Sequence, residues 1–397
     1  MLGPHAVGGT EYPETVPYTD SFGNAAEQPF AGRYLVTQGN SVLVLPTISA
    51  GYAVTDWLSV GAGFIWGIAT LEYSNFSEAL SPAPGAGKQP SDSFFDHGDV
   101  KATLKATDAF IPGFVIGGLA EVTSRLDVGF WFKWMDSVDS DADINTESRY
   151  WQGNGKKNDQ PCLPSEAPDC NITDPEDKEG HLHFPTPMEA RLGVRYHHPR
   201  PGIRPRWAKR ADGGRVRDPM SEDLFDIEVD FTWANNSAVD TLELRFPGRG
   251  GLEGAEIPVN GTPGGVIPGN ADVPHEWKDV FGVRLGGDFV VLPNLLALRA
   301  GGFVETKGQD DKYLNLDFHV GEKVGLGGGA TVRVGPVDIS AAFQHTFYGD
   351  IDNNGVGAIY GLSGDATTSG NRTRQTVNGG VLTSSLNEVA LGGTLRF

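Results

Sequence analysis

The sequence predicts an all-β fold, an antiparallel transmembrane β-barrel, and three observations favour this class. A period-two pattern of apolar and polar residues runs through the end of the chain, which closes on an aromatic residue. The 397-residue sequence contains no apolar run of 18 residues, which excludes a helical membrane span. Short and long connections alternate between the predicted strands, as periplasmic turns and extracellular loops do in outer-membrane barrels.

The last predicted strand shows the alternation most clearly. Val389 and Leu391 fall on one face with the terminal Phe397, while Glu388 and Arg396 fall on the other. Lipid-facing and lumen-facing residues alternate in a membrane barrel, so we expect the apolar row to face lipid. We also expect Phe397 to be the residue through which the barrel-assembly machinery engages the chain.

Eleven long strands are predicted, and together they form a single barrel domain over residues 1–397. They cover residues 40–54, 58–79, 98–121, 126–148, 181–198, 223–246, 276–291, 295–308, 323–334, 337–349 and 385–397. Tight turns are expected at residues 55–57, 123–125, 293–294 and 335–336. Long extracellular loops rich in Gly, Pro, Asn and Asp are expected at residues 80–97, 149–180, 247–275 and 350–384.

One long connection, residues 199–222, falls on the side of the short turns and is strongly basic. It is predicted to be periplasmic, where it is either a solvated loop or a contact for periplasmic components or anionic lipid head groups. Its cations are Arg200, Arg204, Arg206, Lys209, Arg210, Arg215 and Arg217.

The net charge limits the classes of partner that the chain can bind, and the two cysteines indicate the redox compartment. The net charge of −20 argues against nucleic acid and suits a surface in water beyond the membrane. Cys162 and Cys170 lie close together in a polar loop, without a C-x-x-C or zinc-type spacing. The pair therefore favours a disulfide in an oxidising compartment over a redox site.

Charged residues form rows on the predicted inner face of three neighbouring strands. A basic row, an acidic row and a mixed row lie side by side, where opposite charges pair favourably across strands. Such a ladder either fills and stiffens the barrel or takes part in binding or gating. Its members are Arg191, Arg195, Asp226, Glu228, Asp230 and Arg284.

Apolar side chains are predicted at other inward positions, which is out of place in a water-filled porin. Two interpretations stay open: these residues line a pocket for hydrophobic molecules, or they pack against a plug or loop. The positions are Leu43, Leu45, Ile65, Trp131, Met135 and Phe303.

The remaining motifs give little indication of a metal site or of catalysis. Asp350, Asp352 and Asn354 open like a calcium loop, but position twelve is not acidic, and a turn needs the same residues. His181 and His183 share a strand face, yet no third metal ligand is evident, so no metal site is predicted. No G-x-S-x-G or H-E-x-x-H motif is present, and we expect neither enzymatic activity nor a cofactor.

The ordered set of strand motifs resembles the FadL-type family, the outer-membrane transporters of long-chain fatty acids and other hydrophobic compounds. The motifs are LSVGAGF at 58–64, FPTP at 184–187, LGVRY at 192–196, EWKD at 276–279, RLG at 284–286, LRAGG at 298–302 and the closing strand. The resemblance implies a monomeric 14-stranded barrel, plugged by an amino-terminal hatch, which releases ligand sideways through a gap made by a kinked strand.

The first residues depart from the family pattern, because residues 1–5 resemble the end of the third family strand. A signal peptide, the hatch and about three strands would then be missing, through a misplaced start codon or because the chain is a fragment. Eleven strands with two open edges would aggregate or need the missing piece.

The family match also places Trp277 and Lys278 near the extracellular pocket. Lys278 would either neutralise a ligand carboxylate or pair with an acid of the lumen. The predicted function is passive transport of long-chain fatty acids or other hydrophobic compounds across the bacterial outer membrane. The alternatives are a structural or adhesive barrel with partner-binding loops, and a general porin.

Overall fold

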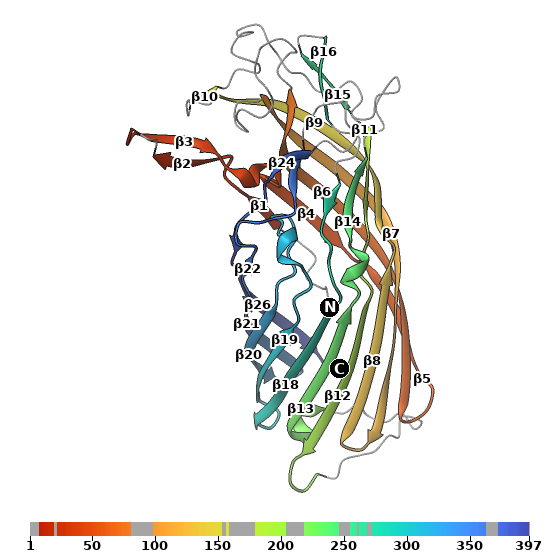
Figure 1. Ribbon diagram of the computed structural model, residues 1–397. Helices are drawn as coiled ribbons and strands as arrows, with labels where there is room; N and C mark the ends of the chain where they lie inside the picture. Colours follow the sequence, from red (N-terminus) through yellow and green to blue (C-terminus); the bar gives the residue numbers. More distant parts are fainter. Residues whose placement is uncertain are drawn as a thin grey trace.

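A computed structural model describes residues 8–19, 22–80, 98–152, 156–158, 179–203, 218–245, 255–259, 262–267, 272–362 and 372–396. Antiparallel strands dominate it, which confirms the predicted fold class. One sheet of 18 strands forms the wall. Figure 1 shows these strands tilted side by side around a common axis, with a small hairpin standing out from the wall.

The wall strands are β1 (Gly8–Glu11), β4 (Gln38–Val44), β5 (Thr47–Ala53), β6 (Leu58–Leu80), β7 (Gly98–Thr123), β8 (Leu126–Met135), β9 (Val138–Gln152), β10 (Lys156–Asn158), β11 (Glu179–Phe184), β12 (Glu189–Pro199), β13 (Asp223–Ala234), β14 (Thr241–Arg245), β17 (Val273–Pro274), β18 (Val280–Leu292), β19 (Leu296–Glu305), β20 (Lys323–Val334), β21 (Val337–Tyr348) and β26 (Ser385–Leu395). Four two-stranded sheets join β2 (Thr15–Thr19) to β3 (Ala25–Pro29), β15 (Ala255–Val259) to β16 (Thr262–Ile267), β22 (Ile351–Asp352) to β25 (Val381–Leu382) and β23 (Tyr360–Leu362) to β24 (Arg372–Thr376). The short helices are η1 (Ala31–Tyr34), α1 (Pro219–Glu222), η2 (Asn236–Ala238) and η3 (Asp311–Tyr313). No helix among the described residues is long and apolar enough to cross a membrane.

Local chemistry explains the tight turns where they were predicted. The β5–β6 turn closes with a hydrogen bond from Val54 N to Leu58 O, and Leu58 N donates to Thr55 Oγ1. Asn294 and Gly335 adopt positive φ angles of 58° and 59° in the β18–β19 and β20–β21 turns. Asn and Gly tolerate this conformation better than other residues, which is why these hairpins turn within so few residues.

Four of the predicted strands are broken in two, and this corrects the strand ranges. The breaks lie at Pro46, at residues 136–137, at residues 185–188 and at residues 235–240. Proline has no N–H to donate to a ladder, which accounts for the breaks at Pro46 and in the Phe-Pro-Thr-Pro segment. The breaks are tied together: Thr186 Oγ1 donates to Met135 O at 3.0 Å, and Asn235 N donates to Met188 O at 2.9 Å.

A bulge at Ala109 and Phe110 reverses the inward face of β7. The pairing with β6 skips from Ile111 to Asp108. Asp108 holds the bulge because its Oδ1 accepts Phe110 N at 2.9 Å and its Oδ2 accepts Asp139 N at 3.0 Å. An extra residue shifts the side-chain period by one, so even-numbered residues face outward below the bulge and inward above it.

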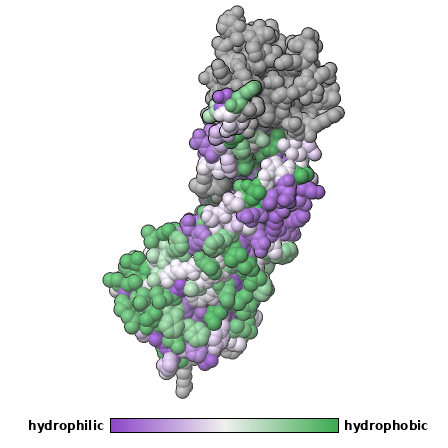
Figure 2. Space-filling view, turned by 60° about the vertical axis from the view of Figure 1, so that its left-hand side comes forward, coloured by the Kyte–Doolittle hydropathy of each residue, from purple (hydrophilic) through white to green (hydrophobic). Residues whose placement is uncertain are grey.

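An apolar belt covers the lower part of the outer surface. Large apolar side chains at alternating wall positions are solvent exposed, including Phe130, Phe231 and Leu285. Figure 2 shows such residues gathered over the lower body, with a hydrophilic area above them. The register sets Val389 opposite Phe343, so the apolar face of β26 lies in this belt as predicted. All residues of β5 and β26 are exposed.

The connection between β12 and β13 ends in a buried ion-pair network. Arg333 binds both Asp218, just before α1, and Asp338, with bidentate contacts of 2.6–3.0 Å. Arg396 of the closing segment reaches the same two carboxylates at 2.9 and 2.7 Å. The network therefore ties the segment before β13 to the β20–β21 hairpin and to the end of the chain.

Several predictions fall outside the described residues. They are the Cys162–Cys170 disulfide, the contact through Phe397 and the cations of residues 204–217.

Candidate functional site

Five apolar side chains meet inside the barrel at the level of the strand breaks. Ile65, Ile111 and Met135 are buried, and Leu43 and Leu45 pack against them. The residues come from β4, β6, β7 and β8 and from the segment just after β4, so the site spans neighbouring wall strands. We call these five residues the inner apolar site; sequence parity had placed four of them inward, and Ile111 was not among the candidates.

Two glycines make room for Met135. A Cβ on Gly113, the residue opposite Met135, would lie 2.6 Å from Met135 Cγ, and one on Gly67 would lie 3.1 Å from Met135 Cε. Both distances are well inside ordinary van der Waals contact. The methionine fills the space that these glycines leave, and its flexible thioether suits an irregular cavity.

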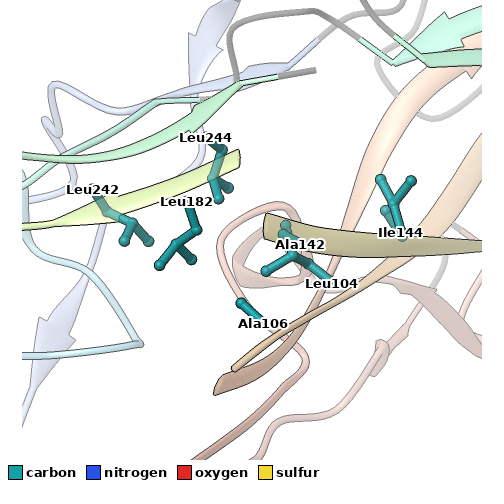
Figure 3. Packing of buried hydrophobic residues seen from close by; sticks show 8 residues of the cluster. Leu104, Ala106, Ala142, Ile144, Leu182, Leu242 and Leu244 are labelled. Atoms are coloured by element: carbon teal, nitrogen blue, oxygen red, sulfur yellow. The ribbon is translucent and has the colours of Figure 1, made fainter. Parts of the chain in front are cut away.

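A second apolar cluster continues upward from this site. Figure 3 shows its side chains turned toward one another from β7 and β9 on one side and β11 and β14 on the other. All are nearly fully buried, so the upper interior is packed and does not hold a water-filled channel at these residues. The cluster comprises Ala102, Leu104, Ala106, Ala142, Ile144, Leu182, Leu242 and Leu244.

Cations lie directly below the inner apolar site. Lys133, two residues from Met135 on the same strand face, forms an ion pair with Glu189. The next residue on that face, Trp131, has the Arg191 guanidinium 5.4 Å from its ring centroid. An apolar site above a row of cations is the arrangement that an amphipathic anion needs.

The remaining ladder residues pair only partly as the sequence suggested. Arg195 contacts the acidic row through Asp226 at 2.7 Å and Glu228 at 3.9 Å. Arg284 turns away to Glu305 at 2.7 Å, with Phe303 4.9 Å from its guanidinium. The structure sets Asp230 opposite Arg284 in the β13–β18 register.

The connection between β19 and β20 folds over the upper interior, and we call residues 306–322 the cap segment. Its ring of Phe318 stacks on Phe184 at the end of β11, with centroids 5.7 Å apart. Its Leu316 carbonyl accepts from Tyr12 Oη at 3.2 Å, and Gly308 accepts from Lys278 N at 2.8 Å. The cap segment thus contacts one wall strand, β11, and the segments next to β1 and β18.

A buried ion pair holds the cap segment to the wall. His275 Nε2 lies 3.0 Å from Asp317 Oδ2, both side chains are at most 3% exposed, and His275 Nδ1 lies 3.0 Å from Val273 O. Burial lowers the pKa of His275, but the charge of Asp317 and the hydrogen bonds outweigh it, and the net pKa is raised.

Trp277 and Lys278 precede their strand, contrary to the prediction. β18 begins at Val280, because Glu276 adopts a φ of 48° that interrupts the extended chain. Lys278 is 64% exposed and lies 3.7 Å from Asp310 of the cap segment. Trp277 packs edge-on against His275 at 5.1 Å, and its buried Nε1 has no acceptor among the described residues.

The calcium candidate forms a turn. Asp352 Oδ1 accepts Asn354 N at 2.8 Å, and Asn354 and Gly355 both have positive φ angles. The outward pair His181 and His183 contacts Asp139 at 3.0 and 3.1 Å across the β9–β11 ladder.

A separate cavity of 320 Å³ opens between β13, β18 and β19, away from the inner apolar site. It is lined in part by Phe231, Phe281, Val304 and Glu305.

Four of the residues described above, one in the inner apolar site and three around it, were not predicted. Ile111 stood beyond an unforeseen bulge, and Lys133 shares parity with Met135 but was not singled out. His275 and Phe318 belong to connections whose folding depends on distant partners. The sequence did contain one indication of the cap segment. The connection between the predicted strands at 295–308 and 323–334 is 14 residues long, and connections of this length often have a functional role.

No protein-family model and no curated protein sequence matches the chain. Solved structures do. The crystal structure of a Pseudomonas aeruginosa FadL homologue aligns with a TM-score of 0.57 and 15% identity, over 96% of this chain and 71% of that one. A deltaS2S3 mutant of TodX, a monoaromatic hydrocarbon channel, aligns with a TM-score of 0.50 and 14% identity, over 91% and 72%. At these identities the likeness shows the fold, and it confirms the architecture that the sequence motifs suggested.

Proposed function

We propose that this chain passes hydrophobic small molecules across the bacterial outer membrane through the interior of its barrel. The single observation that carries the proposal is the inner apolar site, which is buried within a wall whose outer face is also apolar. Apolar surface on both faces serves no purpose in a water-filled porin, but it suits a route for molecules that partition out of water. The fold shared with the FadL homologue supports it.

We propose long-chain fatty acids as the cargo, moving by passive diffusion. The acyl chain would lie in the inner apolar site, and the carboxylate would meet Lys133 or Arg191 below it. The structure therefore favours these cations over the exposed Lys278 as the carboxylate partners. The buried Nε1 of Trp277 offers a further donor near the cap segment.

A neutral hydrocarbon is the second candidate, because Lys133 is already paired with Glu189. A ligand without charge would leave that pair intact and would avoid the cost of desolvating a carboxylate. Trp131 and Phe303 add aromatic surface beside the route.

Equilibrium binding to the full folded chain in detergent tests the proposal and separates the candidates. Oleate and toluene would each be titrated against the unmodified chain, Met135→Gln and the control Phe130→Leu, whose side chain faces outward on the same strand. We expect oleate to bind, with about tenfold weaker affinity in Met135→Gln, because a buried amide replaces an apolar contact. Tighter binding of toluene than oleate would support the hydrocarbon. Binding of neither, or equal binding in Met135→Gln, would overturn the inner apolar site and favour a structural or adhesive barrel.

A further inference from the structure

A histidine and three carboxylates converge inside the lower barrel, apart from the inner apolar site. His197 of β12 and Asp223 and Asp226 of β13 are all buried, and one ligating atom from each lies within 4.8 Å of the others. Asp127 of β8 contacts the same histidine at 2.6 Å. His197 has the parity of Arg191 and Arg195 on β12, so alternation alone also places it on the inner face.

The strand register and a bulge build this cluster. His197 lies directly opposite Asp226, so their side chains share the inner face of the wall. Asp223 has the parity of the outward residues Ile227 and Phe231, but the register shifts between His198 and Pro199 and leaves one extra residue on β13. That bulge turns Asp223 inward, where it is 1% exposed. Bulges commonly re-aim a side chain at functional sites.

The hydrogen bond to Asp127 prepares the other nitrogen of His197 for a cation. When Nε2–H donates to the Asp127 carboxylate, Nδ1 carries the lone pair. Nδ1 lies 3.5 Å from Asp223 Oδ2. This separation is at the outer limit of a hydrogen bond, but two ligands of one tetrahedral zinc ion, each about 2.0–2.1 Å from the metal, are about 3.4 Å apart.

We propose that His197, Asp223 and Asp226 bind a divalent transition-metal ion of the zinc type, with Asp127 as the positioning residue. A histidine that gives its second N–H to a carboxylate is the usual support of a metal-bound imidazole. One nitrogen and two carboxylate oxygens suit zinc, with water completing the coordination. Asp127 is 22% exposed, so the cluster is in contact with solvent on its side. The ion would link the lower ends of β12 and β13.

Cobalt substitution tests the site in the full folded chain. The protein would be stripped with a chelator and titrated with Co²⁺, whose visible absorption reports nitrogen and oxygen ligation. We expect one Co²⁺ per chain with visible absorption, displaced by Zn²⁺. The signal should be lost in His197→Gln and kept in His198→Gln, a neighbouring histidine that stacks on Phe225.

Two further variants distinguish this site from binding by the exposed histidines and from a loss of folding. The double variant His181→Ala, His183→Ala removes the exposed histidine pair and should keep the signal; its loss there would overturn the proposal. Asp127→Asn keeps all three ligands, and we expect about 10–100-fold weaker Co²⁺ affinity. Asp127→Asn therefore tests the metal site even if His197→Gln does not fold. Unchanged affinity in Asp127→Asn, or no Co²⁺ absorption in the unmodified chain, would contradict the site.

Discussion

Single residues without side chains shape the interior of this barrel. Gly113 and Gly67 face Met135 and leave the space that its side chain occupies, while Gly118, farther along β7, has more open surroundings. The inner apolar site therefore depends on where glycine stands as much as on where leucine and isoleucine stand, because interiors are packed closely enough for one methyl group to matter.

Replacing Gly113 by alanine tests this dependence. The new Cβ would lie 2.6 Å from Met135 Cγ and 2.8 Å from Trp134 O, so we expect a loss of about 1–3 kcal/mol in the free energy of unfolding. Urea titration of the folded chain in detergent measures it. Gly118→Ala on the same strand is the control, since its nearest neighbour would be Ser59 O at 3.5 Å. Equal effects of the two substitutions would count against the packing described at Met135.

Asp218 carries a pH-dependent part of the stability. Burial raises the pKa of its carboxyl, but hydrogen bonds and charge from Arg333, with a smaller contribution from Arg396, outweigh burial and lower the pKa from 3.8 to about 2. A lowered pKa stabilises the folded state above the unfolded value, and this contribution is lost as the pH falls through the folded value.

We expect about 2 kcal/mol of stability from Asp218 to be present above pH 4 and to disappear between pH 4 and pH 2. Urea midpoints across this range measure the loss. Asp218→Asn should be less stable at neutral pH and should lack this part of the acid dependence; the same acid profile in the variant would refute the assignment.

At the scale of the elements, alternation predicted the strands and their faces but not their interruptions. β6 and β7 match their predicted ranges to within two residues, because long period-two runs leave little choice of face. The predicted strand at 126–148 is broken into β8 and β9 because both meet β7, whose bulge at Ala109 and Phe110 is stabilised by Asp108. This bulge depends on hydrogen bonds from two backbone N–H groups to the Asp108 carboxylate, one of them from the distant Asp139. Such a contact does not appear in the alternation of apolar and polar residues, so the sequence pattern could not predict it.

The cap segment is held in place by contacts with residues that are distant in the sequence. Phe318 stacks on Phe184, and Asp317 pairs with His275, so both contacts hold residues 306–322 against the wall. Because the net pKa of His275 is raised, its protonated form is the one that stabilises this docking.

The docking contribution should be complete below the unfolded pKa of about 6.5 and should be lost as the pH rises through the raised folded value. Hydrogen exchange of residues 309–320 reports it as protection that falls with rising pH beyond the intrinsic base dependence. His275→Gln should remove this extra fall. Protection that is insensitive to pH in the unmodified chain, or unaltered in the variant, would disprove the link.

Over the whole molecule, the outer surface of the barrel is apolar. Inside the barrel, the inner apolar site lies above a lumen lined by charged residues. Parity placed Leu43, Leu45, Ile65 and Met135 inward from the sequence, but it did not show that they meet. Their meeting depends on the pairing of β4, β6, β7 and β8 and on glycines opposite Met135, which are properties of the folded sheet. Trp277 and Lys278 were placed by resemblance, and the structure puts them at the cap segment.

Uptake into vesicles tests the central claim most directly. The full chain would be reconstituted into liposomes, and the entry of labelled oleate would be compared with that of a hydrophilic solute of similar size and with protein-free liposomes. We predict protein-dependent entry of oleate, no entry of the hydrophilic solute, and slower oleate entry in Met135→Gln than in the outward control Phe130→Leu. Oleate entry no faster than in protein-free liposomes, or free passage of the hydrophilic solute, would contradict transport of hydrophobic molecules through this barrel.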